Sequence, residues 1–127
     1  MLDTDSVSFA LRGQGDVAER LLQHAPSELC ISAVTMAELH YGAETRRSKK
    51  LATLLNTFVR SVAVMPFDAS AAAAFGSLAA QLTRSGTPIG HLDAMIAAHA
   101  LSMNLTLVTN NTKHFSKIPH LRIENWA

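Results

Sequence analysis

Short apolar runs alternate along the chain with longer stretches whose apolar side chains recur every three to four residues. The short runs span residues 29–31, 62–65, 105–109 and 121–124 and are typical of buried strands. Hairpin signals such as Asn-Gly do not occur between them, and strands separated by helices favour a parallel sheet covered on both faces. The pattern predicts one α/β domain over residues 1–127, a three-layer sandwich with a central, mostly parallel sheet and helices on both faces.

Three stretches have a strong helical pattern. Residues 94–103 are apolar nearly all round, which predicts a helix packed inside the domain. Residues 47–59 form an amphipathic helix with Leu51, Leu54, Leu55 and Phe58 facing inward. Asp68 is expected to cap a long helix that ends before Gly86 and Pro88. The expected apolar stripe of that long helix consists of Ala72, Phe75, Leu78, Ala79 and Leu82.

Three acids, Asp3, Glu38 and Asp93, each lie where an apolar run meets the start of a helix. The sequence contains only 10 acids, so carboxylates in apolar stretches are unusual. Because ligands collect at the carboxyl ends of parallel strands, we expect these three side chains to share one edge of the sheet. Buried carboxylates that lie together repel one another, and a hard divalent cation relieves that repulsion. The arrangement predicts a site for Mg²⁺ or Mn²⁺.

Each acid also has a purely structural interpretation. Asp3 and Asp5 could cap a helix over residues 6–11. Thr35 and Glu38 have the spacing of a capping box, and Asp93 could simply complement the dipole of the helix that it opens. The residues alone leave both explanations of these acids open, the structural one and the metal site.

Composition excludes several classes of protein. Apolar residues make up 48% and charged residues 17% of the chain, as in globular domains, and the net charge of +1 indicates no particular partner. Cys30 is the only cysteine, which favours a reducing, cytoplasmic compartment, and no stretch is long and apolar enough for a bilayer. The six histidines lack the spacing of zinc ligands. The basic run of Arg46, Arg47, Lys49 and Lys50 is typical of a solvated helix start.

Four ordered motifs resemble those of PIN-domain ribonucleases, above all the VapC toxins of bacterial type II toxin–antitoxin systems. They are residues 2–5 (LDTD), 31–43 (ISAVTMAELHYGA), 88–100 (PIGHLDAMIAAHA) and 107–115 (LVTNNTKHF), and the closing LRIENW of residues 121–126 is similar as well. The resemblance spans essentially the whole chain. It implies a Mg²⁺- or Mn²⁺-dependent endoribonuclease that cleaves structured RNA, such as a tRNA or a ribosomal RNA loop. It further implies a homodimer inhibited by a VapB-like antitoxin.

By the same resemblance, Asp3, Glu38 and Asp93 are the catalytic and metal-binding residues. Basic residues near the site, Arg84, Lys113 and Lys117, are expected to contact RNA phosphates. This chain departs from the family pattern in two places. Asp5 replaces the usual Asn and adds a carboxylate at the border of the site, whereas Asn110 and Asn111 stand where many PIN domains have a fourth acid. The second departure favours one metal ion over two.

Two other functions fit parts of the sequence. The Asp3-Thr-Asp-Ser-Val start also fits haloacid-dehalogenase-like phosphatases, in which the first Asp is a covalent nucleophile, although a downstream acidic pair near a lysine is missing. A PIN-like module that binds RNA or a protein partner without cleaving it is the non-enzymatic alternative.

Overall fold

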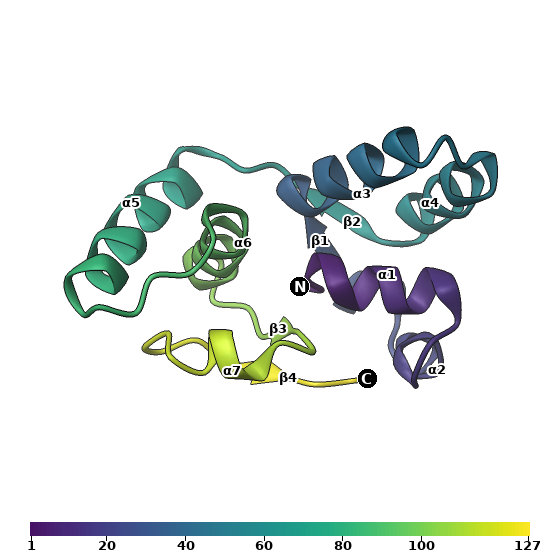
Figure 1. Ribbon diagram of the computed structural model, residues 1–127. Helices are drawn as coiled ribbons and strands as arrows, with labels where there is room; N and C mark the ends of the chain where they lie inside the picture. The colour runs from purple at the N-terminus through teal and green to yellow at the C-terminus, as the bar shows by residue number, and fades with distance from the viewer.

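A computed structural model describes all residues, 1–127, and contains short strands connected by helices (Figure 1). The helices are α1 (Thr4–Arg12), α2 (Val17–Leu22), α3 (Ala33–Thr45), α4 (Lys49–Ser61), α5 (Ala69–Arg84), α6 (His91–Ser102) and α7 (Thr112–Phe115), with a 3-10 turn, η1, at Pro26–Glu28. The strands are β1 (Cys30–Ser32), β2 (Ala63–Met65), β3 (Leu107–Val108) and β4 (Ile123–Glu124).

The strands form a parallel sheet in the order β2, β1, β3, β4, with Leu2 between β1 and β3. β1 pairs in parallel with β2, and β3 with β4. Leu2 joins the two pairs, because it forms parallel bridges with Ile31 of β1 and Val108 of β3. Figure 1 shows α5 and α6 together on one side of the strands and α1 and α2 on the other. The α/β class and the parallel sheet are as the sequence predicts.

Buried apolar side chains pack on both sides of this sheet. One cluster joins α5, α6 and α7 and includes Ile96, Leu107 and Phe115. The other lies under α1 and α2 and is built around Leu2 and Ile31, which are fully buried. None of the helices is both long and apolar enough to cross a membrane. The two clusters fix the helices that carry the candidate acids.

The long helix is confirmed, with one error in its apolar stripe. Asp68 caps α5 by accepting a hydrogen bond from the backbone N–H of Ala71 at 3.0 Å. Leu78 and Leu82 are buried as predicted, but Ala72 is exposed and Ala71 is buried in its place. Positions 71, 75, 78 and 82 follow the helical period, and position 72 lies one residue away from that face.

The other two helices begin at different residues from those predicted. α4 starts at Lys49 and not at Arg47, because Arg47 has a left-handed φ of 49° and the Ser48 hydroxyl caps the helix. α6 starts at His91, three residues before the predicted start, with Gly90 as its N-cap. Asp93 is therefore in the first turn of α6, and six of the 12 residues of this helix are buried, including all of residues 96–100.

Candidate active site

The sheet brings the three predicted acids to one edge of the molecule. Asp3 directly follows Leu2, and its backbone N–H donates to the carbonyl of Val108 at the end of β3 (2.9 Å). Glu38 lies in the second turn of α3, the helix that continues β1, and Asp93 lies in the first turn of α6. The edge is formed by carboxyl ends of parallel strands and by helix starts, as in other open α/β sheets.

Asp3 is almost entirely buried, at 4% exposure, and caps α1. Its Oδ1 accepts from the Ser6 backbone N–H at 2.8 Å, so the capping interpretation is correct for Asp3. It is wrong for Asp5, because α1 starts at Thr4 and Asp5 lies inside its first turn. Capping does not account for the whole environment of the carboxylate. Burial raises the pKa of Asp3 above its ordinary value and the charge of Asp5 raises it further, while hydrogen bonds from Thr109 and Ser6 only partly oppose the shift. A metal ion would offset the cost of ionisation at this position.

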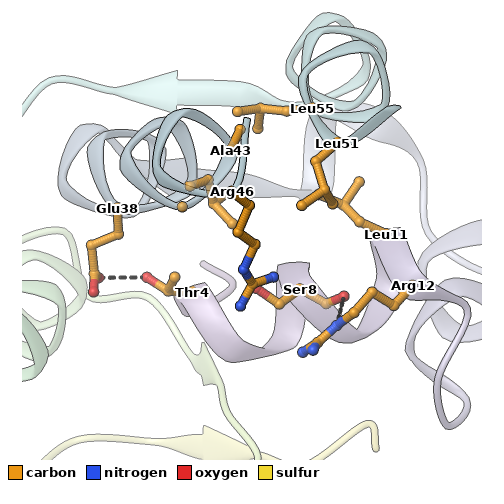
Figure 2. Close-up of a pocket in the computed structure, with 11 residues that line it drawn as sticks. Thr4, Ser8, Leu11, Arg12, Glu38, Ala43, Arg46, Leu51 and Leu55 are labelled. Carbon is orange, nitrogen blue, oxygen red and sulfur yellow. Dashed lines mark hydrogen bonds between the residues drawn. The ribbon is translucent and has the colours of Figure 1, made fainter. Parts of the chain in front are cut away.

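Glu38 does not cap a helix, so the capping-box interpretation is wrong. α3 begins at Ala33, and Ser32 is its N-cap, with Oγ accepting from the Val34 backbone N–H at 3.1 Å. The Glu38 carboxylate instead accepts a 2.6 Å hydrogen bond from the Thr4 hydroxyl, which links α3 to α1 (Figure 2). The Glu38 side chain is thus held against Thr4, the first residue of α1, which directly follows Asp3 in the sequence.

Asp93 is half-buried and lies within electrostatic reach of the other acids. Its pKa is raised first by burial and then by the negative charges of Glu38 and Asp5, whereas His114 lowers it. Because the charge of Asp5 also raises the pKa of Asp3, Asp5 borders the same site, as the sequence predicts. His114 was not predicted. Its position in α7 depends on the turn after β3, where the Asn111 amide lies 3.0 Å from its Nδ1.

The side chains at this edge offer the right kind of atoms for a hard divalent cation, but they are not arranged as a closed metal site. Carboxylates and threonine hydroxyls supply only oxygen, the ligand type that Mg²⁺ and Mn²⁺ prefer. However, no three His, Cys, Asp or Glu side chains approach closely enough to hold a metal ion. One oxygen of the Glu38 carboxylate instead accepts the hydrogen bond from Thr4. The residues fit the metal chemically but do not form a closed ligand shell.

The predicted RNA-binding cations lie on α7, shortly after α7 and at the end of α5. Lys113 is exposed on α7, one residue before His114, which lies within electrostatic reach of Asp93. Lys117 is exposed shortly after α7. Arg84 is exposed in the last turn of α5, and the loop of residues 85–90 separates it from α6. Their role in RNA binding stays a prediction.

The family model of the PIN domain matches residues 1–121. The chain is a member of the PIN domain family. Within the family, it is 38% identical over 128 residues to a tRNA(fMet)-specific endonuclease VapC of Salmonella typhimurium, an alignment that covers 100% of this chain and 97% of the relative. It is 36% identical over 129 residues to Ribonuclease VapC2 of Haemophilus influenzae, with the same coverage. This PIN domain therefore belongs to the VapC ribonucleases.

Solved structures agree with this assignment. The PIN domain superimposes with a TM-score of 0.91 and 34% identity on a chain of VapBC2 from Rickettsia felis bound to a promoter DNA fragment, over 100% of this chain and 98% of the other. For a DNA-bound VapBC from Salmonella typhimurium the values are 0.89 and 39%, over 100% and 97%. The predicted family is confirmed, and the phosphatase interpretation is wrong. Membership in this ribonuclease family implies dependence on a divalent metal in general terms.

Proposed function

We propose that this ribonuclease is the toxin of a toxin–antitoxin pair, an endoribonuclease that cleaves structured RNA with Mg²⁺ or Mn²⁺ at Asp3, Glu38 and Asp93. The observation that carries the proposal is electrostatic. Burial and neighbouring carboxylates raise the pKa values of both Asp3 and Asp93 on one edge of the sheet, and no lysine or arginine side chain is among the groups that oppose these shifts. Perturbed carboxylates at a sheet edge are typical of functional sites.

Each residue has a distinct role in this proposal. Asp3 and Asp93 would hold the cation, directly or through water, and Glu38 would complete the ligand set or orient the attacking water. When bound, the cation lowers the pKa of a coordinated water and neutralises charge that develops on the scissile phosphate. In-line attack by water leaves 5′-phosphate and 3′-hydroxyl ends, so the 2′-hydroxyl of RNA is not needed for the chemistry.

The substrate class follows from the relatives and from the chemistry. Since the 2′-hydroxyl takes no part in bond cleavage, selectivity for RNA has to come from contacts with its shape and with bases exposed in a loop. One relative is named as a tRNA(fMet)-specific endonuclease. We therefore assign a tRNA or a ribosomal RNA loop as the substrate, with Arg84, Lys113 and Lys117 along its phosphates.

The partner is a VapB-like antitoxin. Solved structures similar to this chain are of VapBC complexes from Salmonella typhimurium and Rickettsia felis, with 39% and 34% identity. We assign the same kind of complex, together with a homodimer and a cytoplasmic location, to this chain. Expression of the chain alone is expected to arrest growth of a bacterial host, and co-expression of its antitoxin to restore it.

The direct test uses a tRNA mixture and the purified chain, freed of antitoxin and of host nucleases. Cleavage is expected with added Mg²⁺ or Mn²⁺, no cleavage with EDTA, and a loss of several orders of magnitude in Asp3→Asn. Sequencing of the products should show 5′-phosphate ends. RNA binding that EDTA does not change, with no cleavage under any condition, would contradict the proposal and favour the non-catalytic binding module.

A further inference from the structure

Asp3, Glu38 and Asp93 mark one edge of the sheet, which we call the acidic edge. A cavity of about 170 Å³ lies next to it, between α1, α3 and α4. Thr4 and Glu38 line one end of it, so the cavity begins at the hydrogen bond that joins α1 to α3. Figure 2 shows apolar side chains of Leu11, Leu51 and Leu55 along its inner wall. The proposed cleavage site does not use this space.

Two arginines, Arg12 and Arg46, line the same cavity. The Arg46 side chain reaches from α3 toward α1, and Arg12 lies along α1 (Figure 2). Glu38 is the only acid among the lining residues, and its Oε1 already accepts a hydrogen bond from Thr4. Two arginine side chains therefore border one cavity, and the single carboxylate that lines it cannot balance both positive charges. An anion in the cavity would offset their repulsion.

Two contacts within α1 orient the Arg12 side chain. Its Nε donates to the carbonyl of Ser8 at 3.2 Å, and its guanidinium carbon lies 5.8 Å from the centre of the Phe9 ring. Both contacts leave the two terminal nitrogens available. A preorganised guanidinium with free terminal N–H groups is suited to a phosphate, which it can bind through two parallel hydrogen bonds.

Each arginine is separated along its helix from the contact between Thr4 and Glu38. Arg12 follows Thr4, and Arg46 follows Glu38, by eight residues on the packed helices α1 and α3, which is about 12 Å along each axis. Each arginine is near the C-terminal end of its helix, where the dipole favours a cation. The dipole explains the charge at each position, but it does not explain why both side chains line one cavity that leads to Glu38.

We propose that Arg12 and Arg46 form a subsite for a backbone phosphate of the RNA, a few nucleotides from the bond that is cleaved. This inference rests on the proposed function, because it takes the acidic edge as the place of cleavage. The RNA strand would run from the acidic edge over the cavity, on the side of the site opposite to α7. The subsite adds affinity and fixes the register of the strand, and it takes no part in bond cleavage.

The test compares the wild type with Arg12→Gln/Arg46→Gln on a stem-loop RNA that the wild type cleaves. The double variant is expected to raise KM roughly tenfold, to keep kcat within about twofold, and to reduce the salt dependence of binding, because two positive charges that face the phosphate are lost. The control, Arg60→Gln, removes one positive charge from an exposed residue of α4 that does not line the cavity. It should keep KM within about twofold. Equal urea midpoints verify that all variants fold.

A second measurement locates the phosphate and separates the two proposals. RNAs with one phosphate at a time replaced by a neutral methylphosphonate should bind the wild type more weakly at one or two positions, and the double variant should not respond there. Binding is measured in EDTA, so this test of the subsite does not depend on cleavage. Absence of cleavage would count against the proposed function alone. Identical binding by all three proteins would overturn the subsite. Unchanged RNA binding with loss of a co-expressed antitoxin would assign the cavity to the protein partner.

Discussion

The α6 side and the α1–α3 side of the acidic edge differ in how tightly their side chains are packed. On the α6 side, Asp93 precedes a run of buried residues from Ile96 to Ala100, and the fully buried His99 ring lies 2.8 Å from the hydroxyl of Ser32. On the α1–α3 side, Glu38 faces a cavity of about 170 Å³ whose two arginines are exposed.

The difference indicates how one small domain can both fix a catalytic group and receive a large substrate. A close-packed helix holds its acid in one place, because the movement of buried side chains is limited by their neighbours. The Ser32 hydroxyl also caps α3, so the contact with His99 ties the helix of Asp93 to the helix of Glu38. The opposite side is free to adapt to a ligand.

The largest expected effect is that of Asp93→Asn on cleavage. The substitution keeps the shape of the side chain but removes one negative charge from the site, so RNA cleavage should fall by orders of magnitude. The metal-free protein should be as stable as the wild type or more stable, because burial and the charge of Glu38 disfavour the ionised carboxyl. Mn²⁺ should raise the melting temperature of the wild type and barely change that of the variant. Full activity in a nuclease-free preparation would contradict the mechanism.

His99→Leu tests whether the α6 side depends on its buried hydrogen bond. The leucine fills much of the space of the ring but leaves the Ser32 hydroxyl without its partner on α6, and the fold should lose about 1–3 kcal/mol. Urea unfolding measures the loss. His40→Leu is the matched control, because His40 is exposed on α3, and its midpoint should be nearly that of the wild type. Equal midpoints for both variants would mean that this contact does not hold the α6 side.

The sequence predicts which residues meet at the site better than it predicts the individual contacts that these residues make. Periodicity locates α5 and α6, and the apolar runs locate the strands, so the placement of Asp3, Glu38 and Asp93 at one edge follows from topology. Contacts between distant residues leave no such pattern. His99 could be predicted to be buried and satisfied, but its partner, Ser32, is 67 positions away.

The α1–α3 side was the harder one to predict, for the same reason. Arg46 belongs to a basic run that is typical of a solvated helix start, and Arg12 is an ordinary cation in the last turn of a helix. Only the packing of α1 on α3 brings them to one cavity. The cap of α3 was likewise missed, since Ser32 ends a strand and Thr35 has the more familiar spacing to Glu38.

Thr4→Val should have a smaller effect than the change at His99. It removes the donor of the 2.6 Å hydrogen bond to Glu38 while it keeps the size of the side chain. Because this bond is only partly buried, the loss of stability should be about 0.5–1.5 kcal/mol. Thr53→Val, at an exposed position of α4, is the control and should change the urea midpoint less. A loss as large as that of His99→Leu would show that the two sides are equally dependent on buried polar contacts.

The smallest effect concerns pH and the metal-free protein. Burial raises the pKa values of Asp3 and Asp93 in the folded state above those in the unfolded chain. Ionisation of these groups therefore disfavours folding at neutral pH, and the penalty disappears as the pH falls through the raised pKa values toward the ordinary one. Asp93→Asn lacks its share of the penalty, so its stability advantage over the wild type should shrink as the medium is acidified toward pH 4. The advantage is modest because Asp93 is half-exposed and solvent screens its charge. Urea midpoints in EDTA between pH 7 and pH 4 measure the difference, and an advantage that grows on acidification would contradict the assigned direction of the shift.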